Sequence, residues 1–139
     1  MRVLGVDHGE KRIGIAVSDP NGRMSSRLCV IAHRSREADA RRVTELAREL
    51  GAERIVVGQS FDEHGGPNVA GRRAARFAAV LAEQSNLKVL LWDESLSTAD
   101  ARRALLEAGA PRRKRGGHHD DLAAAILLQS YLDSGMTDG

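Results

Sequence analysis

Cysteine and aromatic residues are scarce in this chain, and long apolar runs are missing. The single cysteine, Cys29, rules out an internal disulfide framework, so we expect a protein of the reducing cytoplasm. Only four aromatic residues occur, which argues against a nucleic-acid-binding platform built on base stacking. The apolar stretch before Asp7 is too short for a secretion signal, and no later run could span a bilayer. We therefore expect no membrane partner.

Arginine is what the chain has in abundance. Its 139 residues can form one domain with a core of its own, and they include 18 arginines against 3 lysines at a net charge of only +2. The planar guanidinium suits bidentate contacts with phosphate, and cations cluster at 112–115 and at Arg72, Arg73 and Arg76. Nucleic acid is thus a candidate partner, although arginine-rich solvated helix faces would give the same composition.

Hydrophobic periodicity predicts the element order β-β-β-α-β-α-β-α-α. Strands are expected at 3–6, 13–17, 27–32, 54–58 and 87–92. Helices are expected at about 35–50, 70–81, 97–108 and 120–132. The first three strands would form a meander, and the last two would join it in parallel through helical crossovers. The pattern indicates an α/β fold with a five-stranded mixed sheet.

Two segments lack apolar periodicity. Residues 59–68 form a polar stretch between a buried strand and a helix, and residues 109–117 are basic. No repeat, linker or second domain is visible. We therefore expect a single domain over 1–139, with a flexible basic loop at about 109–118 and a short disordered tail at 134–139.

Three acidic residues stand at the ends of predicted elements. Asp7 closes the first strand, Glu94 follows the last strand and Asp120 opens the final helix. Adjacent parallel strands present their carboxyl ends at one edge of a sheet, where α/β proteins commonly carry their sites. Strand alternation puts Val3, Gly5 and Asp7 on one face, and Gly5 is expected to leave space beside the carboxylate.

Carboxylates brought together repel one another unless a cation neutralises them. Oxygen ligands favour Mg²⁺ or Mn²⁺, and two such ions about 4 Å apart stabilise both the attacking and the leaving oxygen of a phosphodiester displacement. Asp7, Glu94 and Asp120 would then be metal ligands, with Lys11 and Arg12 near the substrate phosphate. Each acid alone is better explained as a helix cap or a solvated strand end, but their convergence favours a site.

Four sequence motifs carry a resemblance to a known family. They are VDHGEKRIGIAVSD at 6–19, VVGQS at 56–60, DESLST at 93–98 and DDLAAAILLQSYLD at 120–133. Together they resemble the YqgF (RuvX) family over about residues 2–133. The resemblance implies an RNase H-like fold, with helices on both faces of the sheet, related to that of Holliday junction resolvases.

The resemblance also implies a function. Family members are metal-dependent nucleases associated with processing the 5′ end of precursor 16S ribosomal RNA, so pre-rRNA is the first candidate substrate. A resolvase for branched DNA and a non-catalytic, nucleic-acid-binding ribosome-assembly factor are the alternatives, each as a monomer or a homodimer. By position, Asp7, Glu94 and Asp120 would be the catalytic acids, and the register of the last motif favours Asp120 over Asp121.

The chain departs from the family pattern in two places. Gln59 and Ser60 stand where relatives have Leu-Pro, and Ser95 replaces an arginine, so a cation that could bind substrate phosphate is missing. Arg113 and Arg115 of the basic loop are the substrate-binding candidates that could compensate. The glycine turn after the first strand also resembles the phosphate hairpin of actin-like sugar kinases, but those need two such domains closing over a nucleotide.

Overall fold

The computed structural model describes residues 1–96, 99–107 and 120–135. Its strands are β1 (Arg2–His8), β2 (Arg12–Ser18), β3 (Ser25–Ala32), β4 (Ala52–Gln59) and β5 (Lys88–Asp93). Its helices are α1 (Arg36–Leu50), α2 (Val69–Ser85), α3 (Ala99–Glu107) and α4 (Asp120–Asp133), and a 3-10 turn at Glu94–Leu96 follows β5. The predicted order of strands and α-helices is confirmed over the described ranges.

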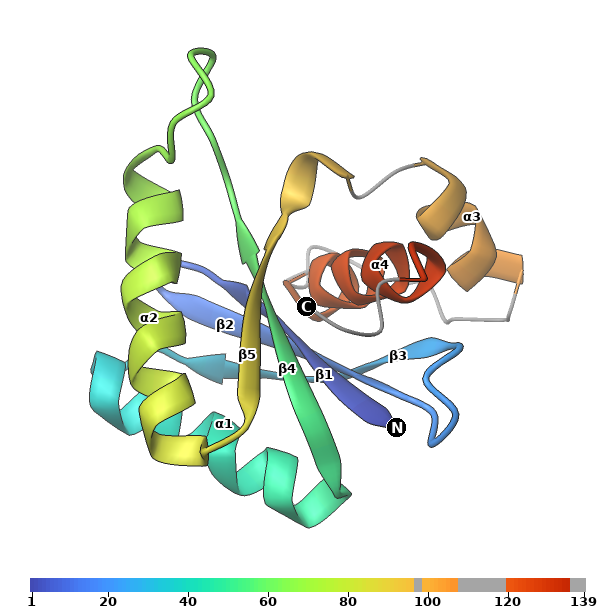
Figure 1. Cartoon of the computed structure of the whole chain (residues 1–139), viewed down its shortest axis with the longest axis horizontal. Coiled ribbons are helices and arrows are strands. Elements are labelled where there is room, and N and C mark those ends of the chain that lie inside the picture. Colours follow the sequence, from blue (N-terminus) through green and yellow to red (C-terminus); the bar gives the residue numbers. More distant parts are fainter. Residues whose placement is uncertain (97–98, 108–119, 136–139) are drawn as a thin grey trace.

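The strands form one mixed sheet in the order β3-β2-β1-β4-β5. β1, β2 and β3 pair as an antiparallel meander, while β4 runs parallel to β1 and β5 runs parallel to β4. Helices α1 and α2 cover one face of the sheet, and α4 crosses the other with α3 beside it (Figure 1). The five-stranded mixed sheet with helices on both faces is therefore confirmed.

Strand alternation divides the core into two clusters. Leu4, Val6, Ile13 and Ile15 point toward α1 and α2, where they pack around the fully buried Phe77. Val3 and Ala16, which alternate with them along β1 and β2, belong to a second cluster on the α4 side that also includes Val56, Ala124 and Leu128. The period-2 pattern of the strands thus decides which side chains share a face with α4.

Helix α4 lies unusually close to the sheet at Gly5. A Cβ atom at Gly5 would stand 2.7 Å from the Leu128 Cβ and 3.2 Å from the Ala124 carbonyl oxygen. The room that Gly5 leaves is therefore taken by α4, which corrects the expectation that it opens space beside the Asp7 carboxylate. The small residues of α4 permit this approach, since Ala124 and Ala125 are fully buried.

Polar contacts of buried side chains hold α4 in place. The Gln129 side chain is buried; it accepts a hydrogen bond from the Ser25 amide at 2.9 Å and donates one to the Arg23 carbonyl at 2.9 Å. From β4, the Arg54 side chain donates a hydrogen bond to the hydroxyl of Tyr131 on α4 at 2.7 Å. Because hydrogen bonds are directional, these contacts set the rotation of α4 as well as its position.

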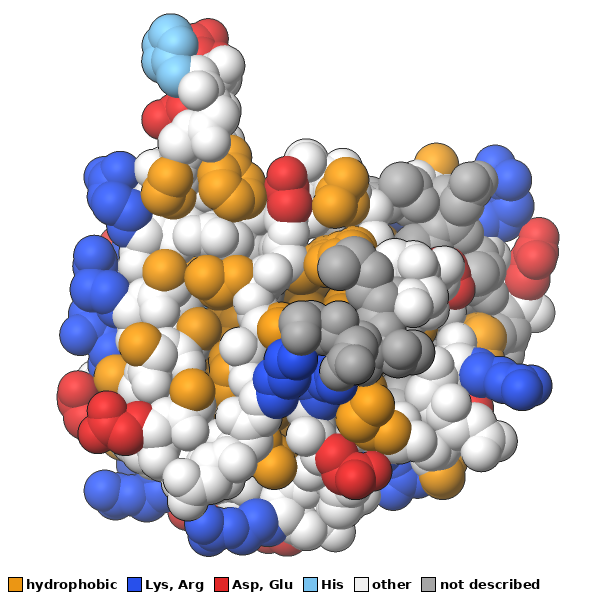
Figure 2. All heavy atoms as spheres, viewed as in Figure 1, with side chains coloured by type: hydrophobic (Ala, Val, Ile, Leu, Met, Phe, Trp, Pro, Cys, Tyr) orange, Lys and Arg blue, Asp and Glu red, His pale blue; other side chains and the backbone are white. Residues whose placement is uncertain are grey.

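The polar segment 59–68, expected as a loop, is an ordered hairpin that projects from the body (Figures 1 and 2). Phe61 and Pro67 form an antiparallel bridge, and the Asp62 amide donates to the Gly66 carbonyl at 2.7 Å. At its base, Asn68 caps α2 by accepting from the Gly71 amide at 2.8 Å. Figure 2 shows acidic and histidine side chains at the tip of this projection.

Several predicted features lie outside the described residues. The basic loop at 109–118, with Arg113 and Arg115, is one of them, and so are Ser97 at the start of the predicted helix 97–108 and most of the tail at 134–139. Across the portion that the structure describes, no helix combines the length and apolarity needed to cross a bilayer.

His8 should make the stability of the fold depend on pH. Its ring stacks on Phe77 at 4.5 Å, and neither ring nitrogen has a hydrogen-bond partner among the described residues. Burial, followed by the charge of Arg73, lowers the pKa of His8 to about 4 from 6.5. Below pH 6.5 the unfolded chain therefore binds the proton more readily, and the free energy of unfolding falls as the pH drops from 6.5 toward 4.

We expect this loss to reach about 1 kcal/mol at pH 5, a value discounted because solvent partly screens the ring. His8→Phe keeps the stacking on Phe77 and should flatten this part of the profile. Urea unfolding at pH 7 and pH 5 measures the difference. An equal loss of stability in both proteins would assign the acid sensitivity to another group.

Candidate active site

Asp7 lies on the face of the sheet that α4 covers. It is the second-last residue of β1, and alternation turns it away from the α1 and α2 side, toward which Val6 points. Its cross-strand partner on β2 is Gly14, which carries no side chain. Asp7 therefore lies two residues after Gly5 on the same face of the sheet, next to the place where α4 approaches β1 closely. Its neighbour on the adjacent strand is a glycine.

Glu94 reaches the same edge of the sheet from β5. It follows the last residue of that strand, and β5, β4 and β1 run parallel, so their carboxyl ends lie side by side. Gly58 near the end of β4 separates the two acids. A Cβ at Gly58 would stand 3.0 Å from the Leu127 Cδ2 and 3.8 Å from the Glu94 Oε2. The glycine thus lets Glu94 and α4 approach each other over β4.

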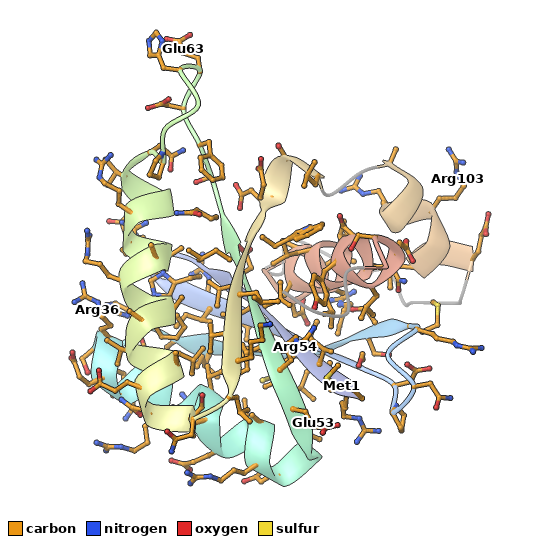
Figure 3. All side chains as sticks on the ribbon, in the orientation of Figure 1. Met1, Arg36, Glu53, Arg54, Glu63 and Arg103 are labelled. Atoms are coloured by element: carbon orange, nitrogen blue, oxygen red, sulfur yellow. The ribbon has the colours of Figure 1, made fainter. Side chains whose placement is uncertain are left out.

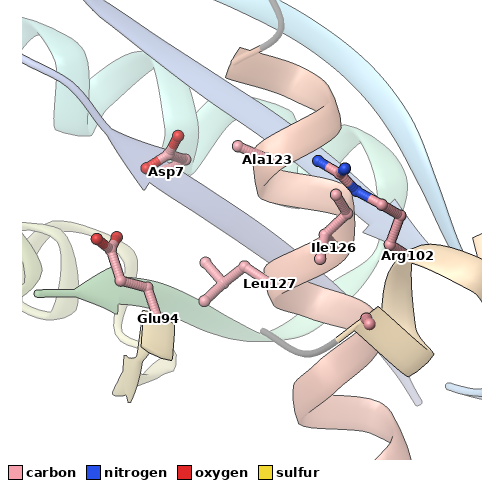
Figure 4. Close-up of a pocket in the computed structure, with 7 residues that line it drawn as sticks. Asp7, Glu94, Arg102, Ala123, Ile126 and Leu127 are labelled. Carbon is pink, nitrogen blue, oxygen red and sulfur yellow. The ribbon is translucent and has the colours of Figure 1, made fainter. Parts of the chain in front are cut away.

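A cleft of about 600 Å³ opens between these acids and the two helices. It is lined by Asp7, Glu94, Ala99, Arg102, Ala123, Ile126 and Leu127. In Figure 4 the carboxylates of Asp7 and Glu94 flank one side, and the apolar residues of α4 lie between them and Arg102. The structure therefore brings together two of the three predicted acids.

The carboxylates fit a hard cation by their chemistry. Glu94 is in contact with solvent. Even so, its partial burial, and then the charge of Asp93, raise the pKa of Glu94 above its ordinary value. A cation offsets both effects, and oxygen donors are those that Mg²⁺ and Mn²⁺ prefer. Asp7 and Glu94 are only a pair. Within the described residues no three His, Cys, Asp or Glu side chains are grouped to hold a metal.

The third predicted acid, Asp120, is the first residue of α4, and its side chain lies outside the described set. Its neighbour Asp121 is described and faces elsewhere. The Asp121 carboxylate is buried and forms an ion pair with Arg27 on β3, with an N–O distance of 3.3 Å. Asp121 thus ties α4 to the edge of the sheet that is farthest from β5.

Two of the cations that were predicted to bind substrate do not line the cleft. Lys11 belongs to the turn between β1 and β2, and Arg12 is the first residue of β2; the Gly9 amide donates to the Arg12 carbonyl at 2.9 Å. Neither is among the described residues that line the cleft. Sequence reasoning missed Arg102, which does line it. The available signal was the three-residue spacing between Arg102 and Leu105, a residue buried in the α4 cluster.

A second depression adjoins the cleft on the side of the projecting hairpin. It is lined by Ser60, Phe61, Asp62, Glu63, Gly65, Asp93, Glu94 and Ser95. Ser95 turns back on Asp93, since its amide and hydroxyl both donate to the Asp93 Oδ1, at 2.9 and 2.8 Å. Phe61 is 38% exposed, so it is the aromatic side chain most accessible beside the acids.

The chain is similar to known proteins along nearly its whole length. Residues 1–134 match a family model described as "RuvX: Holliday junction resolvase". A protein of Symbiobacterium thermophilum is 46% identical over 96% of this chain and 93% of its own length. One of Pelotomaculum thermopropionicum is 43% identical over 96% and 88%. Both bear the name "Putative pre-16S rRNA nuclease".

Solved structures agree on the fold. Thermus thermophilus RuvC superposes with a TM-score of 0.66 at 16% identity, covering 98% of this chain and 96% of that one. A structure of the same protein with Holliday junction substrate superposes with a TM-score of 0.62 at 19% identity, covering 99% and 96%. This likeness establishes the RNase H-like fold. With the family match across nearly the whole sequence, it shows that the chain belongs to the RuvX family.

Proposed function

We propose that this protein is a metal-dependent nuclease that hydrolyses phosphodiester bonds at the 5′ end of precursor 16S ribosomal RNA during ribosome biogenesis in the cytoplasm. The observation that carries the proposal is the placement of Asp7 and Glu94 on one cleft, at the carboxyl ends of β1 and β5. The substrate assignment rests on the names of the relatives, which are similar over 96% of the chain.

Asp7, Glu94 and Asp120 are the proposed catalytic acids and metal ligands. Residues 120, 123 and 127 are spaced three and four apart, so their positions fall on one face of α4, and two of them line the cleft. Asp121 is already paired with Arg27, which favours Asp120 as the third acid. When bound, two Mg²⁺ or Mn²⁺ ions would polarise the phosphate, activate the attacking water and stabilise the leaving oxygen.

The chain's own residues position the reaction. Asp7 and Glu94 would hold the metal at the strand ends, and the apolar α4 residues Ile126 and Leu127 form the adjacent wall of the cleft. Lys11, in the turn after β1, Arg12, at the start of β2, and Arg113 and Arg115 are proposed to contact the phosphates farther along the strand. The 139 residues act as a single nuclease domain, as a monomer or homodimer.

The first experiment is cleavage of a labelled pre-16S 5′ leader with Mg²⁺ or Mn²⁺, alongside the same reaction in EDTA. We expect removal of the metal to lower the rate at least about a thousandfold, because the metal contributes several kcal/mol of charge stabilisation. A four-way DNA junction serves as the competing substrate. Tight RNA binding without cutting under either metal would instead favour a non-catalytic assembly factor.

A DNA junction resolvase is the second candidate function. The description of the matching family model and the shared fold with RuvC favour it. Preferential cutting of the four-way junction over the RNA leader in the same assay would select this alternative.

A further inference from the structure

We infer that Arg102 binds a substrate phosphate next to the scissile bond, and that the nucleic-acid backbone therefore passes the acids on the α3 side, away from the projecting hairpin. The inference rests on the proposed function, because it takes nucleic acid as the ligand of the cleft. It goes further by naming a binding residue and the path of the strand.

The two sides of the acidic pair differ in charge. On the α3 side, Arg102 is the only cation among the described lining residues of the cleft, and its other neighbours there are alanine, isoleucine and leucine. On the hairpin side, Asp62, Glu63, Asp93 and Glu94 line the depression, with no described lysine or arginine. A phosphodiester strand carries a negative charge at each step, so it is attracted to the first side and repelled by the second.

Packing fixes Arg102 at the cleft. Leu105 of α3 is 2% exposed and packs against α4, and Arg102 lies one helical turn before it. Figure 4 shows the guanidinium end of Arg102 directed across α4 toward Ala123. The next residue, Arg103, extends outward from α3 in Figure 3 and is absent from the described cleft lining. Two adjacent arginines on one helix thus have different surroundings.

The donors of Arg102 suit a phosphate. Arg102 takes part in none of the described ion pairs, such as that between Arg27 and Asp121. Arg102 is exposed although it lines the cleft, and its guanidinium offers a planar pair of N–H groups. A bidentate contact with a phosphate oxygen pair uses that geometry fully, whereas a lysine would supply only a point charge.

The test compares Arg102→Gln with Arg103→Gln, which makes the same charge change one residue away. Fluorescence anisotropy with a labelled single-stranded RNA in EDTA gives the affinity over a series of KCl concentrations. For Arg102→Gln we expect affinity to fall about tenfold and the slope of log K against log salt to lose about 0.7. Arg103→Gln and Glu63→Gln should keep the wild-type slope. Arg102→Lys should keep the slope while binding more weakly than wild type.

Cleavage kinetics provide the second readout. Arg102→Gln should raise KM about tenfold with little change in kcat, since the contact is made equally with substrate and transition state. An unchanged slope and KM in Arg102→Gln would overturn the inference, and so would equal losses in Arg103→Gln. The binding arm requires no turnover. Arg102-dependent binding by a protein that never cuts would sustain the inference and overturn only the nuclease proposal.

Discussion

Asp7→Asn is expected to lower the rate of RNA cleavage at least about a thousandfold while leaving the protein folded. The substitution keeps the size of the side chain but replaces a charged oxygen ligand with a neutral amide, which weakens cation binding at the cleft. Asp7 is only partly buried, near the end of β1, and asparagine has nearly the same size, so the change should cost little stability. Single-turnover cleavage and thermal unfolding of the same samples measure the two effects.

Asp120→Asn and Asp121→Asn form the matched pair of controls on α4. The first should lose cleavage as fully as Asp7→Asn. The second should retain it, but should lose about 1–3 kcal/mol of unfolding free energy because Arg27 loses its buried partner. If Asp121→Asn stopped cleavage in a stable protein while Asp120→Asn still cut, the third acid would be Asp121.

Gly5→Ala is expected to damage both stability and activity without touching any proposed catalytic group. The new methyl would stand 2.7 Å from the Leu128 Cβ and 3.2 Å from the Ala124 carbonyl oxygen, which are rigid parts of α4. Helix α4 must therefore move away from the sheet, at a cost of about 1–3 kcal/mol in the free energy of unfolding. Because α4 also carries Asp120, a shift near 1 Å would lower the cleavage rate about a hundredfold.

Gly66→Ala provides the control for this substitution. A Cβ there would lie 3.8 Å from the Asp62 carboxylate, which is ordinary van der Waals contact, so the exchange of glycine for alanine should be nearly neutral. Urea unfolding gives the stability of both variants, and cleavage under saturating metal gives the rate. A Gly5→Ala protein with wild-type stability and rate would mean that the approach of α4 to β1 is looser than the structure shows.

Sequence patterns alone were enough to predict the elements and their order. Apolar residues that repeat every second or every third and fourth position specify strands and helices through local geometry, so the strands around Val6 and Val56 and the helix around Phe77 were predictable. The sequence also placed Asp7 and Glu94 at strand ends, and the parallel direction of those strands implied a common edge. The direction of Asp7 away from Val6 followed from alternation alone.

Which groups meet depends on packing in three dimensions, because such contacts join segments that are far apart in sequence. The room at Gly5 is filled by Leu128, more than a hundred residues away, and the polar segment 59–68 becomes a hairpin through its own hydrogen bonds. The partner of Asp121 on β3 and the position of Arg102 at the cleft likewise come from the packing of α4 and α3. Periodicity specifies the face of an element, but only packing specifies what that face meets.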